Sequence, residues 1–232
     1  MLPWAPVPFR GFADADGKFF RALAKHQDRD WFQAHKREFE EGWLAPMKEL
    51  LGDVRAAIDN AFPHCDLDEP KVFRIYRDVR FSKDKSPYKT HIGGVLPVKR
   101  TGKMTEVPIA LYFHVGEPRA FAASGHYMMD PSALGRFRQA VADDARGREL
   151  DKMLASLQKK GFSVDSHGMY KRVPKGYDPR HPRAEHLKRQ GLTVGFPDLP
   201  KGALLSPKLT GILAKNAKLA APLVEWLVFA TL

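Results

Sequence analysis

The sequence predicts a single α+β domain in which an antiparallel sheet is flanked by helices from both ends of the chain. Three observations predict this class. Apolar residues at helical spacing fill the start of the 232-residue chain, β-branched and aromatic residues fill the middle, and helical spacing returns toward the end. Turns between consecutive strands are short, which favours antiparallel pairing. We therefore expect a helical layer over 14–62, a sheet core over about 70–128, and helices with a hairpin over 131–232.

The N-terminal layer is predicted to hold three helices. Asp14 and Asp16 are N-cap candidates for KFFRALAKHQ, and Asp30 is the candidate for the next helix. Pro46 is expected to open the third helix as its first residue. The second helix carries an aromatic stripe whose spacing is typical of a buried face: Trp31, Phe32, His35, Phe39 and Trp43.

Four strands are predicted in the middle of the chain, in the segments KVFRIYRDVRF, HIGGVLPVKR, VPIALYFHV and RAFAASGHYMM. Turns are expected at Thr101-Gly102 and at Gly116-Glu117-Pro118. Pro131 then begins a helix near 131–145, and a second helix follows to about residue 160.

The last part of the chain is predicted to be more irregular. GFSVDSHGMYKRV reads as a hairpin with a turn at 166–168, and a proline-punctuated loop then leads into a short helix. The final segment, 205–232, is expected to form a helix or a helix pair broken at Pro222. Basic residues around 170–175 are read as a solvated edge of the hairpin.

Composition excludes several classes of protein. With 44% hydrophobic and 28% charged residues, the chain has the composition of an ordinary globular protein rather than a disordered one. The single cysteine, Cys65, excludes an internal disulfide framework and suits a reducing compartment. The N-terminus lacks a secretory pattern, and the apolar stretch 219–232 is too short and too interrupted to span a bilayer. We expect a cytoplasmic protein without a membrane partner, and the sequence indicates neither a cofactor nor an oligomeric state.

The net charge of +11 is distributed unevenly. Residues 1–70 carry a net charge of −4, residues 71–130 carry +6 and residues 131–232 carry +9. The basic character therefore lies after residue 70, which indicates a cationic face able to attract phosphate groups, carboxylates or nucleic acid.

The segment 71–91 concentrates this charge. It has seven Lys and Arg residues against two aspartates, and aromatic or aliphatic residues lie between them. In an extended chain, Arg74 and Arg80 share one face, whereas Arg77 points into the opposite, apolar face. A buried guanidinium needs a partner. The candidate partners are Asp78, Asp84 and Glu38.

These cations are candidates for an anion site. The loop after residue 81 is expected to offer N–H, hydroxyl and guanidinium donors, which suits an oxyanion. The predicted anion-binding residues are Arg74, Arg77, Arg80, Lys85 and Tyr88. Alternation makes Arg77 the structural arginine, and leaves Arg74, Arg80 and Lys85 as the better ligand candidates. An alternative is an internal salt-bridge network that ties the strand to the helices through Asp30, Glu38, Asp78 and Asp84.

The same segment carries a family resemblance. The pattern Arg74-x-x-Arg77-Asp78-x-Arg80-Phe81 followed by Asp84-Lys85-x-x-Tyr88 resembles the signature of an uncharacterised family of about this length, found in bacteria and some fungi. That family is a domain of unknown function. The likeness extends over most of the chain and includes the blocks Arg29-Asp30-Trp31-Phe32-x-x-His35-Lys36, Pro174-x-Gly176-Tyr177-Asp178 and His181-Pro182. The resemblance implies no reaction. It does suggest that Tyr177, Asp178 and His181 pack against the central motif.

Several functions fit these residues. One is an anion site for a phosphate or carboxylate ligand. Another is an enzyme acting on a phosphorylated substrate, with Asp78 or His91 as the base, although the sequence has no phosphate loop and no nucleotide fingerprint. A metal site from His91, His114 and His126 with Asp78 lacks ligand spacing, so we predict no metal.

A nucleic-acid-binding or protein-interaction module without catalytic activity is the alternative from a different class. Basic residues interleaved with aromatic residues can follow a phosphate backbone and stack on bases. The sequence matches no established nucleic-acid-binding motif. Retention on heparin or single-stranded DNA at physiological salt would separate this hypothesis from the enzyme hypotheses.

Overall fold

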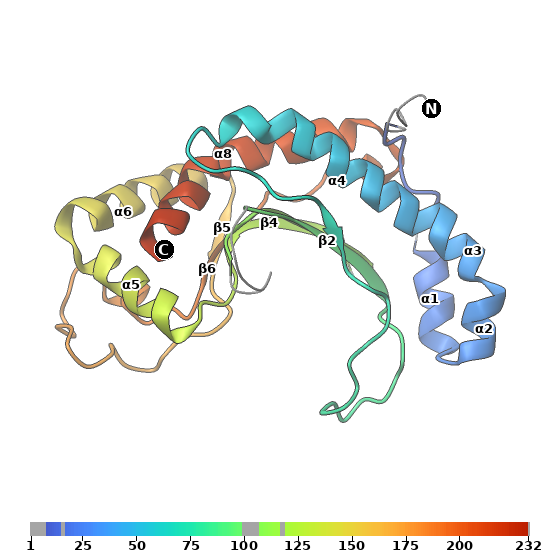
Figure 1. Cartoon of the computed structure of the whole chain (residues 1–232), viewed down its shortest axis with the longest axis horizontal. Coiled ribbons are helices and arrows are strands. Elements are labelled where there is room, and N and C mark those ends of the chain that lie inside the picture. Colours follow the sequence, from blue (N-terminus) through green and yellow to red (C-terminus); the bar gives the residue numbers. More distant parts are fainter. Residues whose placement is uncertain (1–7, 15–16, 99–106, 117–118, 232) are drawn as a thin grey trace.

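The computed structural model describes residues 8–14, 17–98, 107–116 and 119–231. It confirms the α+β class, because its sheet is antiparallel throughout and helices from both ends of the chain flank it. The strand order is β1-β2-β3-β4-β6-β5. Figure 1 shows the sheet curved into an arch, with α4 and α8 along its outer side. The strands are β1 (Lys71–Val72), β2 (His91–Pro97), β3 (Ile109–Gly116), β4 (Phe121–His126), β5 (Ser163–Asp165) and β6 (Leu192–Gly195).

Three of the four predicted central strands form at the expected places. The first does not extend as predicted over 71–81, because β1 ends at Val72 and the chain leaves the sheet after Phe73 donates its N–H to the Gly93 carbonyl oxygen at 2.9 Å. An extended strand would have carried Arg77 into the apolar layer, which is costly without a buried partner. The turns predicted at Thr101-Gly102 and at Glu117-Pro118 lie outside the described residues.

The N-terminal helices lie close to their predicted positions, but their boundaries differ. The second predicted helix is divided at His35, and Pro46 does not open a new helix, because the backbone stays helical from Lys36 through Ile58. Asp28, rather than Asp30, caps the second helix, and its Oδ1 accepts the Trp31 N–H at 2.7 Å. Asp30 lies inside the first turn, where its negative charge interacts favourably with the positive end of the helix dipole. Asp14 accepts the Phe19 N–H at 3.0 Å, and Asp16 lies outside the described residues. The elements are α1 (Lys18–Lys25), α2 (Arg29–Ala34), α3 (Lys36–Phe39), the π-helical turn η1 (Glu40–Leu44), α4 (Ala45–Ile58) and the 3-10 turn η2 (Asp59–Ala61).

The C-terminal half differs from the prediction in two places. The hairpin expected around 166–168 does not form, because β5 pairs instead with β6, thirty residues further along. The last helix is continuous through Pro222, since it packs in the core along both of its halves. The helices are α5 (Pro131–Ala142), α6 (Asp144–Lys159), α7 (Ala184–Leu187), the 3-10 turn η4 (Ala203–Leu205) and α8 (Lys208–Thr231).

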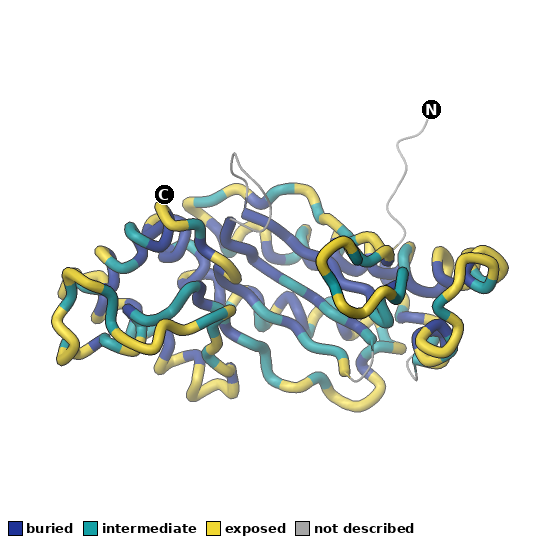
Figure 2. Tube along the Cα trace, turned by 90° about the horizontal axis from the view of Figure 1, so that it is seen from below, coloured by how far each residue is buried: buried dark blue, intermediate teal, exposed yellow. Residues whose placement is uncertain are grey.

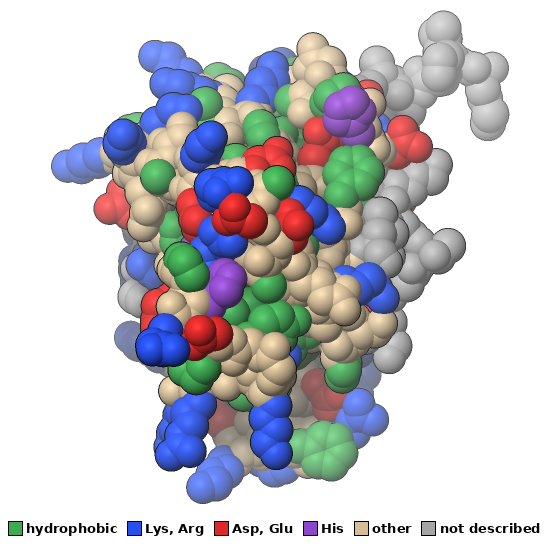
Figure 3. Space-filling view, turned by 90° about the vertical axis from the view of Figure 1, so that its left-hand side faces the viewer, with side chains coloured by type: hydrophobic (Ala, Val, Ile, Leu, Met, Phe, Trp, Pro, Cys, Tyr) green, Lys and Arg blue, Asp and Glu red, His purple; other side chains and the backbone are tan. Residues whose placement is uncertain are grey.

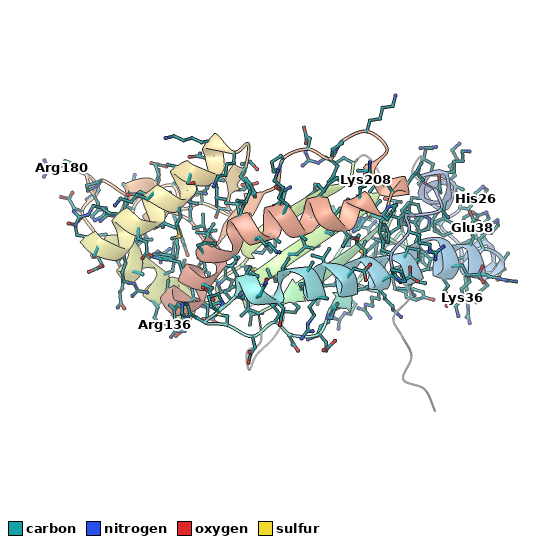
Figure 4. All side chains as sticks on the ribbon, turned by 90° about the horizontal axis from the view of Figure 1, so that it is seen from above. His26, Lys36, Glu38, Arg136, Arg180 and Lys208 are labelled. Carbon is teal, nitrogen blue, oxygen red and sulfur yellow. The ribbon has the colours of Figure 1, made fainter. Side chains whose placement is uncertain are left out.

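Helix α8 joins two clusters of buried side chains. The first contains the N-terminal helices and strands β2 and β3, and the second contains α5, α6 and β6. Leu213 of α8 belongs to the first cluster, whereas Leu223 and Leu227 belong to the second. Figure 4 shows α4 and α8 side by side over the sheet. None of the helices in the described residues has the length and apolar character that a bilayer span requires.

The inner side of the arch is a sheet face that no long helix covers (Figure 1). Figure 2 looks onto this concave face, where the strands are buried or half-buried and exposed residues gather on the loops around them. Two long connections border it: residues 73–90, between β1 and β2, and residues 166–190, before β6. This face positions the residues discussed next.

Candidate functional site

The cationic segment of the sequence forms a projecting hairpin over residues 73–90, which we call the cationic hairpin (Figure 1). The Arg77 N–H donates to the Pro87 carbonyl oxygen at 2.8 Å, and the Lys89 N–H donates to the Ile75 carbonyl oxygen at 2.8 Å. Tyr76 and Tyr88 form a bridge between its two arms. Because the hairpin pairs with itself rather than with the sheet, its charged side chains stay near water.

Three of the predicted anion-binding residues have partners within this hairpin. Arg80 binds Asp78 through two contacts, Nε–Oδ1 at 3.0 Å and Nη2–Oδ2 at 2.7 Å. Arg77 forms an ion pair with Asp84, and Lys85 Nζ donates to the Val79 carbonyl oxygen at 2.9 Å. The partner of Arg77 is thus Asp84 rather than Glu38.

Both aspartates of the hairpin are held in the ionised form. Hydrogen bonds from Arg80 lower the pKa of Asp78 to about 2. Hydrogen bonds from Ser86, and then from Arg77, lower the pKa of Asp84 to about 2. A carboxylate in this state is a poor general base at neutral pH, so the arrangement does not favour the catalytic role considered for Asp78.

Tyr88 anchors the hairpin to the N-terminal helices. Its ring stacks on Phe32 of α2, with ring centroids 4.5 Å apart, and its N–H donates to Gln27 Oε1 at 3.0 Å. The residue is only 3% exposed. Tyr88 therefore packs at the base of the hairpin, away from Arg80 and Lys85 at its tip.

A pocket of about 220 Å³ lies where the hairpin leaves the sheet. The remaining anion-binding candidate, Arg74, lines it, and so does His91, the first residue of β2. Gly93 leaves room for the Tyr112 ring to lie over β2, since a Cβ there would be 3.1 Å from the Tyr112 Oη. The six lining residues are Phe73, Arg74, Lys89, His91, Gly93 and Tyr112.

Side chains with rings continue from this pocket across the concave face. Antiparallel register places them there: Gly93 pairs with His114, and His114 pairs with Phe121. The His91 and His114 centroids are 4.3 Å apart, and those of His114 and Phe121 are 4.7 Å apart. The Tyr112 Oη lies 3.1 Å from His114 Nδ1. The rings of His91, His114 and Phe121 thus form a stack that spans β2, β3 and β4.

The charges around the pocket are cationic. Burial, followed by Lys89 and Arg77, lowers the pKa of His91. Burial, followed by His91 and Arg119, lowers the pKa of His114 to about 4. Burial and Arg74 likewise lower the pKa of Lys89. Because the neighbouring charges that act on these three groups are all positive, an anion in the pocket would relieve repulsion among them.

The histidines considered as metal ligands do not converge. His91 and His114 are close, but His126 follows Gly125 on β4 and therefore faces the helical side of the sheet, where it is fully buried. Asp78 lies on the hairpin. Within the described ranges, no group of three His, Cys, Asp or Glu side chains is arranged to hold a metal ion.

Sequence reasoning missed most of the pocket. Phe73, Lys89 and Tyr112 were not singled out, and His114 was considered only as a metal ligand. The two-residue spacing of Tyr112 and His114 in β3 is a signal that both lie on one face. The sequence carries no comparable signal for the strand register that places His91 and Phe121 beside them.

A buried arginine was also missed, at the opposite end of the molecule. Arg183 is 6% exposed, and its Nε donates to the Val141 carbonyl oxygen at 2.7 Å at the end of α5. Its guanidinium also lies near two aspartates of α6, at 3.6 Å from Asp144 and 3.7 Å from Asp151. Gly147 makes room for it, because a Cβ there would be 2.2 Å from the Arg183 Nε. Arg183 thus ties α5 to α6 and has a structural role.

The later part of the family resemblance lies at this same end, not against the cationic hairpin. Tyr177 packs against the second core cluster, and His181 Nδ1 accepts the Arg183 N–H at 3.0 Å. Figure 4 shows Arg180 at one end of the molecule and His26 and Glu38 at the other. Figure 3 looks onto the former end, where Lys and Arg side chains project around acidic ones. Charge there is mixed, as in the Asp178–Arg180 pair at 3.8 Å.

Comparison with known proteins gives one match. The family model described as Conserved hypothetical protein (DUF2461) matches residues 17–226. No curated protein and no solved structure matches the chain.

Proposed function

Because the chain belongs to the conserved hypothetical protein family DUF2461, whose description specifies no reaction, we propose a function from its pocket: it binds an anionic ligand through a phosphate or carboxylate group. Arg74 and Lys89 would hold the anion, with His91 beside it. The observation that carries the proposal is the charge of the pocket. Every neighbouring charge that shifts the pKa of Lys89, His91 or His114 is positive.

The state of Arg74 supports this proposal. Among the described residues, its guanidinium takes part in no ion pair or hydrogen bond, whereas Arg77 and Arg80 are both paired to aspartates. Lys89 Nζ donates to the Arg74 carbonyl oxygen at 3.0 Å, which leaves its remaining N–H groups for a ligand. A planar guanidinium beside an ammonium group suits the oxygens of a phosphate or carboxylate.

The size of the pocket favours a small ligand or one small group of a larger ligand. Its volume of about 220 Å³ is below the roughly 300–1,000 Å³ of sites that enclose drug-sized ligands. The rings of Phe73 and Tyr112 form apolar walls, with centroids 6.3 Å apart. A phosphorylated substrate is compatible with this shape, and His91 is then the nearest candidate for proton transfer.

Titration with sulfate tests the proposal, because sulfate remains a dianion over the whole working pH range. We expect saturable shifts of the backbone amides around Arg74, Lys89 and His91 in two-dimensional NMR spectra. Arg74→Ala and Lys89→Ala should each weaken binding about tenfold or more, since a hydrogen bond to a charged group contributes about 1.5–3 kcal/mol. Inorganic phosphate should compete with sulfate.

Two matched variants serve as controls for this titration. Lys218→Ala removes an exposed cation from α8, on the outer side of the arch, and should leave sulfate binding unchanged. Arg80→Ala removes a cation from the tip of the cationic hairpin and should also have little effect, because Asp78 already binds that guanidinium. Equal weakening by Arg80→Ala and Arg74→Ala would move the site to the hairpin tip and contradict the proposal.

A further inference from the structure

The rings of the concave face do not end at the pocket. Tyr127 follows His126, the last residue of β4, and lies beside the connection 166–190 that borders the concave face. Its ring packs on His167, with centroids 4.7 Å apart. Burial and the charge of Tyr127 raise the pKa of Tyr112, so the two phenols lie close enough to interact. The concave face therefore carries two groups of rings, one that extends from Phe73 to Phe121 and one formed by Tyr127 and His167.

Much of this ring surface is accessible. Tyr127 is 54% exposed and His167 is also exposed, whereas Phe73 and Tyr112 are half-buried. Helices α4, α5, α6 and α8 all lie on the outer side of the arch (Figure 1). An isolated exposed aromatic ring needs no explanation, but two groups of rings on one open sheet face indicate a binding surface.

Cations border these two groups of rings. Arg74 and Lys89 stand at the pocket, and the Arg119 guanidinium lies over the Phe121 ring at 5.2 Å from its centroid. The register also places the carboxylate of Asp165 on this face, at the outer strand β5. The cationic groups thus lie among the rings, and Asp165 lies at the edge of the sheet.

We propose that the concave face binds single-stranded nucleic acid, with a backbone phosphate in the Arg74–Lys89 pocket and bases against Tyr112 and Tyr127. This inference rests on the proposed function and names its ligand. A single strand offers what this face lacks: phosphates spaced along a flexible backbone for the cations, and unpaired bases for the rings. The bases of a duplex are already paired and stacked, so a duplex would meet only the cations.

Fluorescence anisotropy with a fluorescein-labelled thymidine 12-mer tests this proposal on the full chain, with a uridine 12-mer and a 12-base-pair duplex in parallel. We expect both single strands to bind more tightly than the duplex. If the three cations Arg74, Lys89 and Arg119 each neutralise one phosphate, the logarithm of the binding constant should fall with the logarithm of salt concentration at a slope of about −2.

The chain provides a matched pair of variants. Tyr127 and Phe229 are both 54% exposed, but Phe229 lies on α8, on the outer side of the arch. Tyr127→Ala should weaken binding of the thymidine 12-mer about tenfold, because stacking on an aromatic side chain contributes substantially per base. Phe229→Ala should leave it unchanged. Sulfate binding at the pocket should be the same in both variants.

Failure of this proposal can be told apart from failure of the anion site. If sulfate binds at Arg74 but the 12-mers bind no tighter than the duplex, the nucleic-acid proposal is wrong and the anion site stands. Equal 12-mer binding by Tyr127→Ala and wild type would also overturn it, since charge alone would then account for the affinity. If neither sulfate nor the 12-mers bind, both proposals are wrong.

Discussion

His114 is the residue whose protonation the fold opposes most clearly. Its ring lies between His91 and Phe121, and burial with neighbouring positive charge lowers its pKa to about 4. In the unfolded chain an imidazole protonates near pH 6.5. Between these values the unfolded state binds more protons than the folded state, so the free energy of unfolding rises with pH from about 4 to about 6.5.

Replacement of His114 by Gln should remove part of this pH dependence. We expect the variant to lose less stability than the wild type when the pH is lowered from 6.5 to 4, as measured by urea unfolding at each pH. Some dependence should remain, because the pKa values of His91 and His186 are also lowered. The exposed His64→Gln is the control. Identical slopes for wild type and His114→Gln would show that His114 is not held neutral.

Sulfate binding should depend on pH through the same residues. An anion beside His91 favours the protonated ring, so binding should take up a proton and tighten as the pH falls from 7 toward 5. Sulfate titrations followed by NMR at pH 7, 6 and 5 measure this change in affinity.

The cationic hairpin has a buried base and an exposed tip. At the base, Tyr88 stacks on Phe32 and is almost fully buried. At the tip, Phe81 is 96% exposed and the ion pairs of Arg77 and Arg80 are reached by water. Exposed ion pairs contribute little to stability, whereas a buried aromatic side chain contributes several kcal/mol.

This difference predicts the effect of three substitutions on urea unfolding. Tyr88→Ala should lower the free energy of unfolding by about 3–5 kcal/mol, as removal of a buried aromatic ring does elsewhere. Tyr88→Phe keeps the stacked ring and should have little effect. Asp84→Asn should also change stability little, because its partner Arg77 remains hydrated. A large loss of stability in Asp84→Asn would instead support the salt-bridge network as a main support of the fold.

At the scale of the whole molecule, one helix connects two cores. Helix α8 places Leu213 in the first cluster and Leu223 in the second, so neither cluster is complete without it. This arrangement predicts that the chain unfolds as one unit.

Two tryptophans that are buried in the described part of the chain report on the two clusters separately. Trp43 belongs to the first and Trp226 to the second. In protein labelled with 5-fluorotryptophan, the fluorine NMR signals of both should disappear at the same urea concentration, because the shared helix couples the clusters. Circular dichroism gives the midpoint for the helices as a control. Separate midpoints for Trp43 and Trp226 would indicate two independently folding units.

The sequence determined those parts of the structure that depend on neighbours along the chain. Helical spacing located the N-terminal helices, and Pro131 marks a helix start that α5 confirms. The N-cap of α2 was predicted less accurately. Asp28 and Asp30 are both suitable capping residues, and local sequence does not distinguish between them. The break predicted at Pro222 does not occur. Burial of both halves of α8 in the core outweighs the backbone hydrogen bond that a proline cannot donate.

The concentration of positive charge was visible in the sequence, but the tertiary structure decided which of these cations have partners within the protein. Arg77, Arg80 and Lys85 find partners inside the cationic hairpin, whereas Arg74 remains at a pocket whose other walls come from β2 and β3. Strand register alone places His91, His114 and Phe121 in one stack. The physical reason is that charge and helical propensity are properties of local sequence, whereas a binding face is made by residues that meet only when distant strands pair.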